Sequence, residues 1–199
     1  MEKNSLKHIT KLVAIGGSAG SLQVLLRLFS QIPSGFSIPF LVVLHRNVQY
    51  ESALEELLAT RTALRVKEVE EKEKIQAGHV YICPPDYHVL VEKNHSFSLD
   101  YSEKVNFSRP SIDVVFKSAA EAYKSHLVAL LLSGANADGA TGLLHVRQHK
   151  GITVVQSPDE AEVSYMPQQA IQLVKPHYVL GFNDMVLFMQ GLLLQGQAS

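Results

Sequence analysis

The stretch Leu12-Val-Ala-Ile-Gly-Gly-Ser-Ala-Gly-Ser21 decides the fold class of this chain. The continuous apolar run from Leu12 to Ile15 is typical of a strand that is buried on both faces of a sheet. A glycine-rich turn follows, and apolar residues then recur at helical spacing between Ser21 and Ile32. A buried strand that passes through a tight turn into a helix is the repeating unit of a parallel α/β sheet.

The rest of the chain repeats this alternation of strand-length apolar runs with stretches of helical period. Strands are predicted at 40–44, 126–132 and 152–156, and helices at 50–60, 111–124, 139–149, 168–174 and 183–194. The pattern predicts an α/β fold with a doubly wound, mostly parallel sheet and helices on both faces. One segment departs from it, because turn residues separate short apolar runs at 80–83, 88–91 and 96–99. We therefore expect a small antiparallel excursion on the edge of the sheet between Gly78 and Tyr101.

Composition narrows the class of protein. The chain has 199 residues, of which 46% are hydrophobic and 19% are charged, so it can bury a substantial core and is too apolar to be disordered. The 18 basic and 19 acidic residues leave a net charge of −1, without the cationic excess of a nucleic-acid-binding protein. The sequence also lacks an apolar run of the ~18 residues that span a bilayer, so we expect a protein that is not embedded in a membrane.

Neither an internal repeat nor a linker rich in proline, glycine or serine divides the chain. We expect a single domain over residues 1–199, with a core of about 12–195. The lone cysteine, Cys83, is typical of a reducing compartment, and residues 1–11 are not followed by the long apolar run of a signal peptide. Both features indicate a cytoplasmic protein, while the oligomeric state stays open.

Polar residues follow three of the predicted strands, at the edge where α/β sheets bind their ligands. Ser18 comes after the first strand, His45 after the second, and Asp138 lies in the glycine-rich turn after the strand at 126–132. A serine hydroxyl becomes a strong nucleophile when an imidazole accepts its proton, and a carboxylate then orients that imidazole. These residues predict nucleophilic acyl transfer, with backbone N–H groups of the first turn available to a developing oxyanion.

Each of these residues also has a simpler interpretation. Ser18 could cap a helix or bind a phosphate, His45 could be a hydrogen-bonded structural histidine, and Asp138 could cap the helix that begins near Gly139. The first turn matches neither the dinucleotide-binding fingerprint nor the Walker motif. Each simpler interpretation explains one residue alone. The position of all three residues at one sheet edge favours the catalytic interpretation.

Metal binding is a weaker alternative. His145 and His149 stand four residues apart on a predicted helix, but no acidic residue lies between them, and an exposed helix face explains this spacing better than a metal site does. The nine histidines and the single cysteine form no cluster with the spacing of metal ligands. Cys83 lies between Ile82 and Pro84 and is interpreted as a buried, inert thiol. We therefore expect no bound metal.

Six blocks of sequence occur together between about residue 12 and the last predicted helix. They are Ala14-Ile-Gly-Gly-Ser-Ala-Gly20, Val43-Leu-His45, Gly78-His-Val-Tyr-Ile82, Arg109-Pro-Ser-Ile-Asp-Val-Val-Phe116, Leu132-Ser-Gly-Ala-Asn-Ala-Asp-Gly-Ala140 and Met166-Pro-Gln-Gln-Ala170. In this order they resemble the catalytic domain of the chemotaxis receptor methylesterases, the CheB family.

The resemblance implies a doubly wound serine hydrolase that cleaves glutamate methyl esters on chemoreceptors and that, in many members, also deamidates receptor glutamines. It implies no metal or organic cofactor, and a methylated chemoreceptor or receptor-like protein as the partner. The family's nucleophile falls on Ser18, its general base on His45 and its orienting carboxylate on Asp138. Arg109 is expected near the site, where it could engage the charge of the substrate. The expected surroundings of substrate and oxyanion are Gly17, Ala19, Arg109, Ala135 and Met166.

The chain departs from the family pattern beside each expected catalytic residue. Ala19 replaces a threonine, Arg46 stands where a methionine is frequent, and Ala135-Asn136 stand where Met-Gly is common. The oxyanion donor would therefore have to be a backbone N–H group. These changes motivate an alternative, a catalytically weakened binding or scaffold module in a signalling system, and a hydrolase of another small ester or amide is a third hypothesis. The resemblance begins near residue 12, so we also expect no receiver domain in this chain.

Overall fold

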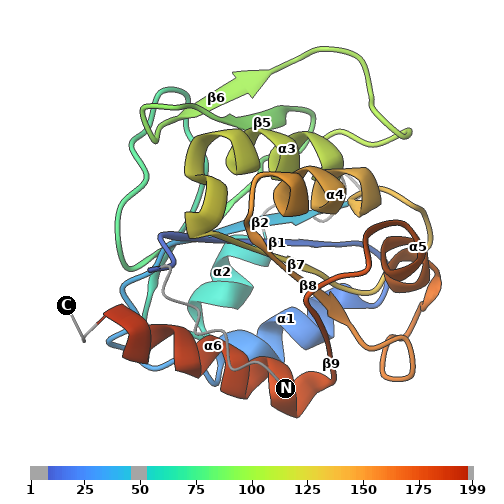
Figure 1. The fold of residues 1–199 in the computed structure, drawn as a ribbon. Coiled ribbons are helices and arrows are strands. Elements are labelled where there is room, and N and C mark those ends of the chain that lie inside the picture. The colour runs from blue at the N-terminus through green and yellow to red at the C-terminus, as the bar shows by residue number, and fades with distance from the viewer. Residues whose placement is uncertain (1–8, 46–52, 197–199) are drawn as a thin grey trace.

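The computed structural model describes residues 9–45 and 53–196 and has two layers of helices around a central sheet (Figure 1). The main sheet contains β1 (Leu12–Gly17), β2 (Phe40–Leu44), β3 (Arg65–Glu68), β4 (His79–Ile82), β7 (Leu127–Leu131), β8 (Ile152–Gln156) and β9 (Tyr178–Leu180). All of its pairs are parallel, in the order β3-β4-β2-β1-β7-β8-β9. The predicted α/β class, with a mostly parallel sheet and helices on both faces, is confirmed.

Helices cover both faces of this sheet. Above it in Figure 1 lie α3 (Ile112–Tyr123) and α4 (Ala140–Gln148), and α5 (Tyr165–Val174), at the right of the figure, packs into the same half of the core. Below the sheet lie α1 (Ser21–Phe29), α2 (Ala53–Ala59) and α6 (Phe182–Gly196). A short 3₁₀ turn, η2 (Lys124–His126), leads into β7. The helices expected from the sequence are present, with bounds that differ by a few residues, and the start of the helix predicted at 50–60 lies outside the described residues.

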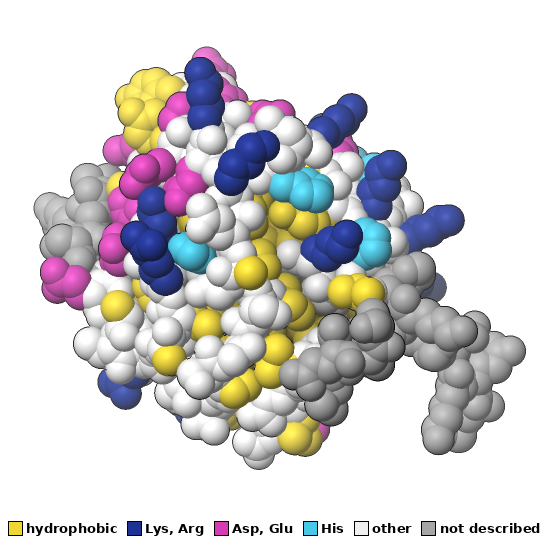
Figure 2. Space-filling view, turned by 90° about the vertical axis from the view of Figure 1, so that its left-hand side faces the viewer, with side chains coloured by type: hydrophobic (Ala, Val, Ile, Leu, Met, Phe, Trp, Pro, Cys, Tyr) yellow, Lys and Arg dark blue, Asp and Glu magenta, His cyan; other side chains and the backbone are white. Residues whose placement is uncertain are grey.

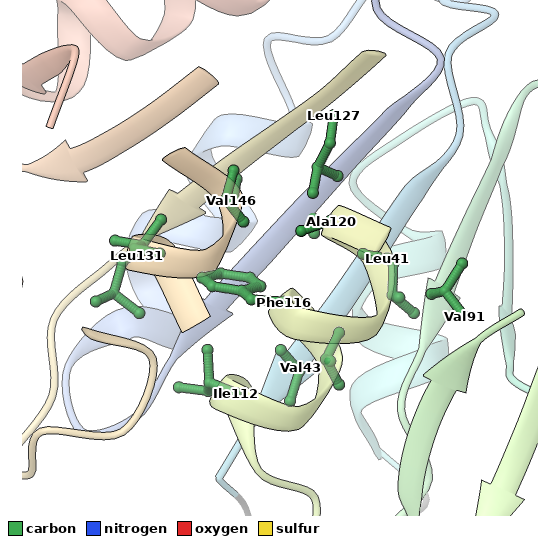
Figure 3. Packing of buried hydrophobic residues seen from close by; sticks show 14 of the residues in the cluster. Leu41, Val43, Val91, Ile112, Phe116, Ala120, Leu127, Leu131 and Val146 are labelled. Carbon is green, nitrogen blue, oxygen red and sulfur yellow. The ribbon is translucent and has the colours of Figure 1, made fainter. Parts of the chain in front are cut away.

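The alternation of side chains along β1 divides the hydrophobic core into two halves. Leu12 and Ala14 belong to the cluster under α3, α4 and α5, whereas Val13 and Ile15 belong to the cluster on the side of α1 and α6. Successive residues of a strand point to opposite faces, so one continuous apolar run supplies both halves. Figure 3 shows the upper half, in which Phe116 of α3 lies between the helices and the sheet.

The antiparallel excursion is smaller than the sequence predicts. Among the strands, β5 (His88–Val91) and β6 (Phe97–Asp100) are the antiparallel pair, and they form a separate sheet of two strands that packs on α3 (Figure 1). Lys74 adds an isolated antiparallel bridge to Ser96, beside β6. The first run of the predicted excursion, 80–83, instead contributes β4, which is parallel to β2 and β3. That part of the prediction is wrong. Parallel strands are usually connected through a helix, whereas residues 69–78 connect β3 to the parallel strand β4 without one, so the sequence has no helical pattern that would indicate a parallel pair.

The strand order reverses between β1 and β7. The chain passes from β1 to β2 on one side of the sheet and returns to the other side of β1 as β7. Loops diverge at such a point and leave a crevice at the carboxyl ends of the strands, where α/β proteins bind ligands. The turn after β1 and the turn after β7 therefore face each other across the expected ligand site.

The amino ends of the strands form the opposite face of the molecule, which is on the left in Figure 1. Figure 2 shows basic, acidic and histidine side chains interspersed there with hydrophobic surface. This mixture agrees with the net charge of −1. In the part of the chain that the structure describes, every helix is too short or too polar to cross a lipid bilayer.

Candidate active site

Backbone pairing places Ser18 between His45, which follows β2, and the turn that follows β7. Gly17 lies opposite Leu44 in the register of β1 and β2, and the His45 N–H donates a hydrogen bond of 3.2 Å to the Gly17 carbonyl. On the other side, the Ser18 N–H donates to the Ser133 carbonyl at 2.9 Å. Adjacent parallel strands lie about 4.8 Å apart, so this register brings Ser18 beside both His45 and the turn after β7.

The turn after β1 is shaped by its backbone. Ser18 is half-buried, and its carbonyl accepts hydrogen bonds from the hydroxyl and the N–H of Ser21, the first residue of α1. Gly20 has φ 77°, and a Cβ atom there would lie 2.6 Å from Cβ of Glu162 and 2.8 Å from the Ser133 hydroxyl. Glycine is needed at this position both for the left-handed conformation and for space.

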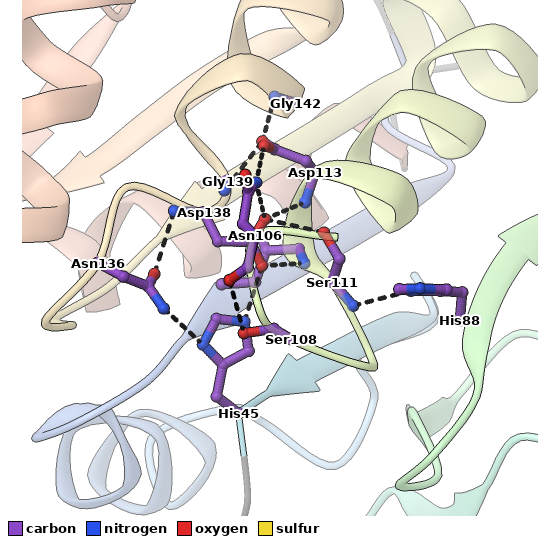
Figure 4. Close-up of polar contacts among 11 residues, drawn as sticks. His45, His88, Asn106, Ser108, Ser111, Asp113, Asn136, Asp138, Gly139 and Gly142 are labelled. Atoms are coloured by element: carbon purple, nitrogen blue, oxygen red, sulfur yellow. Dashed lines mark hydrogen bonds and ion pairs between the residues drawn. The ribbon is translucent and has the colours of Figure 1, made fainter. Parts of the chain in front are cut away.

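His45 and Asp138 form the central contact of the site. Nε2 of His45 lies 2.7 Å from Oδ2 of Asp138, and the Asp138 side chain is fully buried (Figure 4). The same carboxylate accepts bonds from the Ser111 hydroxyl, from the N–H groups of Ile112 and Asp113, and from the Asn106 amide. Asp138 thereby caps the N-terminus of α3, where negative charge is favoured.

These contacts determine the charge of Asp138. Burial by itself raises the pKa of this carboxyl, but the hydrogen bonds from His45, Ile112, Asp113 and Ser111 favour the charged form, and the pKa is lower than its ordinary value. Asp138 is therefore ionised at neutral pH and can only accept hydrogen bonds. It follows that Nε2 of His45 carries a proton, which leaves Nδ1 as the basic nitrogen of the neutral ring.

A second carboxyl group, on Asp113, lies behind Asp138. It accepts hydrogen bonds from the N–H groups of Gly139 and Gly142, at the start of α4, and from the Asn106 amide. Burial raises the pKa of Asp113 to about 6, and the charge of Asp138 adds to this effect, although the bonds from Gly142 and Gly139 oppose it. Asp138, which precedes α4, thus caps the start of α3, and Asp113, in the first turn of α3, caps the start of α4.

Nδ1 of His45 faces the side chain of Asn136, whose Nδ2 lies 3.4 Å away (Figure 4). Oδ1 of Asn136 accepts a hydrogen bond of 3.1 Å from the Asp138 N–H. Within the described residues, the Ser18 hydroxyl makes no hydrogen bond with His45. The structure therefore contains the imidazole–carboxylate pair, and it places Ser18 next to that pair through the backbone.

The other predicted site residues lie around these loops. Ala19 is exposed, and its carbonyl accepts a bond of 2.7 Å from the Ser133 hydroxyl, while Ala135 is exposed in the turn after β7. Met166 is buried against Gly134, where a Cβ atom would lie 2.4 Å from Cε of Met166 and 3.1 Å from Cβ of Ser18. Met166 therefore supports the turn beside Ser18. Gly17 completes β1, as its pairing shows.

Arg109 makes its contacts within the protein. Its guanidinium donates to the carbonyls of Ser102 and Tyr101, stacks over the Tyr101 ring, and lies 3.8 Å from the Asp86 carboxylate. These contacts hold the segment between β6 and α3, which also carries Asn106. The expected role of Arg109 in binding substrate stays a prediction, and Arg46 lies outside the described residues.

Sequence reasoning missed Ser111, Asp113 and Asn106. The block that begins at Arg109 contains the first two, but that block was assigned no role beyond Arg109. A serine at the start of a predicted helix, with an aspartate in the first turn, is a helix-cap signal that could have drawn attention to Ser111 and Asp113. Across the residues that the structure describes, His, Cys, Asp and Glu form no group of three or more that could hold a metal ion.

A family model described as CheB methylesterase matches residues 13–189 of this chain. The chain belongs to the CheB methylesterase family. A relative from Leptospira interrogans is 42% identical over 171 residues, which cover 86% of this chain and 89% of that protein. The protein-glutamate methylesterase/protein-glutamine glutaminase of Thermotoga maritima is 34% identical over 173 residues, or 85% of this chain and 50% of that one.

The fold agrees with a solved CheB structure. The catalytic domain of the CheB methylesterase from Thermotoga maritima superposes with a TM-score of 0.87 at 32% sequence identity, over 92% of this chain and 98% of that domain. The resemblance drawn from the six sequence blocks is thus confirmed at the level of family and fold. The same comparison supports the small two-stranded sheet as part of the CheB architecture.

Proposed function

We propose that this CheB-family chain is a protein-glutamate methylesterase that hydrolyses glutamate methyl esters on chemoreceptors, with Ser18 as nucleophile, His45 as general base and Asp138 as the orienting carboxylate. The contact of 2.7 Å between His45 and the buried Asp138, beside Ser18 in the strand register, carries this proposal. The names of its relatives support the reaction class.

The first half of the reaction forms an acyl-enzyme. Oγ of Ser18 attacks the ester carbonyl while Nδ1 of His45 takes the hydroxyl proton, and the ionised Asp138 stabilises the resulting imidazolium. His45 then gives that proton to the leaving methoxide, which departs as methanol. We assign stabilisation of the negative oxygen of the intermediate to backbone N–H groups in the first turn of α1, beside the exposed Ala19, because the first turn of a helix leaves such groups without an intrahelical partner.

The second half restores the enzyme. A water molecule attacks the acyl carbon as Nδ1 of His45 accepts a proton from it, and Ser18 leaves and regains that proton. The net reaction consumes one water and releases a glutamate carboxylate, methanol and one proton. The same steps convert a glutamine amide to glutamate with release of ammonia, which is the glutaminase activity that we propose as the second reaction of the site.

Release of methanol from a methylated receptor tests the proposal directly. Ser18→Ala should lower kcat/KM by roughly 10³-fold or more, because it removes the group that forms the covalent intermediate. Ser30→Ala, at the exposed far end of α1, is the matched control and should retain the wild-type rate. Unchanged turnover in Ser18→Ala would exclude Ser18 as the nucleophile, and absence of turnover in a folded wild-type protein would favour a binding module.

A further inference from the structure

Both ring nitrogens of His45 are engaged, although only one of these contacts belongs to the proposed triad. Nε2 is 2.7 Å from Asp138, and Nδ1 is 3.4 Å from Nδ2 of Asn136. The orientation of the Asn136 amide is set by its other end, because Oδ1 accepts the Asp138 N–H at 3.1 Å. The amide nitrogen, which can only donate, therefore faces the ring.

This arrangement makes Asn136 a competitor of the nucleophile. Since Asp138 is ionised, the ring proton stays on Nε2 and Nδ1 offers a single lone pair. The Ser18 hydroxyl needs that same lone pair in order to transfer its proton. An N–H group of Asn136 already points at it, and a second good hydrogen bond cannot form there at the same time.

Asn136 also opposes the charged state of the ring. When Nδ1 receives the proton of Ser18 it becomes a donor, and it then faces the amide nitrogen of Asn136, which is a donor as well. The amide could present its oxygen only by giving up the bond from the Asp138 N–H. Of the carboxyl groups in the described chain, Asp138 contacts this ring directly, at Nε2, and Asp113 lies behind Asp138, linked to it through the Asn106 amide.

We propose that Asn136 occupies the basic nitrogen of His45 in the resting enzyme and must be displaced before Ser18 can react. Asn136 is then a positioning residue: it holds the His45 ring and prevents Ser18 from transferring its proton to Nδ1 when no substrate is bound. The inference rests on the proposed function, since it takes His45 as the general base. It goes beyond the triad by assigning a role to a half-buried amide whose described side-chain hydrogen bonds are to His45 and Asp138.

The rate of Ser18 labelling by a fluorophosphonate, measured without substrate between pH 5 and 9, tests this role. Asn136→Ala removes the competing donor, and labelling at neutral pH should become roughly 3- to 10-fold faster, the effect of one neutral hydrogen bond. In Asn136→Asp one carboxylate oxygen can still accept the Asp138 N–H. The other oxygen replaces the amide nitrogen and presents an acceptor, instead of a donor, to Nδ1 of His45. It should hold the proton on the ring, and the acidic limb of the rate profile should move about one pH unit upward.

Ala137→Asp is the matched control, because it adds a carboxylate to an exposed position of the same turn. It should move the acidic limb much less than Asn136→Asp does. A purely structural role for Asn136 predicts that Asn136→Ala slows labelling and that Asn136→Asp, which preserves the turn, behaves like the wild type. Either of these results would overturn the inference.

A second measurement separates this inference from the proposed function. In ¹⁵N NMR spectra of the neutral ring, the Nδ1 resonance of His45 should shift toward that of a nitrogen without a hydrogen bond in Asn136→Ala. An unchanged resonance overturns the inference even where Ser18→Ala abolishes methanol release. A shifted resonance supports it even where the wild type proves inactive on methylated receptor.

Discussion

The turn that carries Ser18 and the turn that carries Asp138 lie on neighbouring strands, yet they are held in different ways. The Asp138 carboxylate receives five hydrogen bonds, from His45, Asn106, Ser111, Ile112 and Asp113. The Ser18 turn is held instead through its main chain, by backbone bonds and by the hydroxyls of Ser21 and Ser133, and it needs the absence of side-chain atoms at Gly20. The acid–base half is specified by bonds to a side chain, and the nucleophile half by bonds to its main chain and by space.

This contrast separates activity from stability. Loss of the Asp138 carboxylate leaves buried donors without an acceptor, and each such donor costs free energy. Loss of the Ser18 hydroxyl leaves no described partner unsatisfied, because the neighbouring contacts of Ser18 are made by its backbone. The two halves should therefore respond differently to matched substitutions, even though both are needed for the proposed reaction.

The largest effect is expected for Asp138→Asn. The new amide would set an N–H group against the donors of α3 and favour the wrong tautomer of His45, so kcat should fall by about 10⁴-fold. The free energy of unfolding, measured in urea, should fall by about 1–3 kcal/mol. Ser18→Ala should lose activity to a similar extent but change the unfolding free energy by no more than ~0.5 kcal/mol. Equal stabilities of the two variants would remove the distinction between the halves.

An intermediate effect is expected for Gly20→Ala. The added methyl group would meet Glu162 and Ser133, and φ of 77° is unfavourable for alanine, so the turn must shift and carry Ser18 with it. A displacement of about 1 Å lowers kcat/KM on the order of 10²-fold. Gly35→Ala, where an added Cβ meets no atom within 4 Å, is the control and should retain activity. Full activity of Gly20→Ala would show that space does not position the nucleophile.

The smallest effect concerns pH and belongs to the acid–base half alone. The pKa of Asp113 is raised from 3.8 to about 6, so the folded state binds this proton more tightly than the unfolded state does. Its contribution to stability is therefore greatest at low pH and is lost as the pH rises from about 4 to about 6. Asp113→Asn should remove this slope, which can be measured as the difference in unfolding free energy between wild type and variant. A difference that is constant from pH 4 to pH 7 would contradict the prediction.

Much of the site could be predicted because parallel strands end at a common edge. Ser18, His45 and Asp138 follow β1, β2 and β7, which are adjacent in the sheet, and the contact between His45 and Asp138 agrees with that expectation. The bonds from Ser111 and Asn106 could not be predicted in the same way. They come from the segment that leads into α3, and its approach to Asp138 depends on packing that no periodic pattern encodes.

The fold was predictable where apolar runs are long. The central strands are buried on both faces, so their hydrophobic runs are continuous and easy to identify. The edge strands β3 and β9 were missed, because Arg65–Glu68 is largely polar and Tyr178–Leu180 has only three residues. Edge strands are half-exposed and short, and charged side chains protect them from pairing with other chains, which hides their pattern.

The reciprocal caps of α3 and α4 have a consequence for local motion. First-turn amides of a helix normally exchange their hydrogens quickly with solvent, since fraying opens the ends first. Here the amides of Ile112 and Asp113 are bonded to Asp138, and those of Gly139 and Gly142 are bonded to Asp113. Exchange at Ile112 and Asp113 requires the bonds to the Asp138 carboxylate to open, and exchange at Gly139 and Gly142 requires the bonds to Asp113 to open. These amides are internal reporters of whether the acid–base half of the site is assembled in solution.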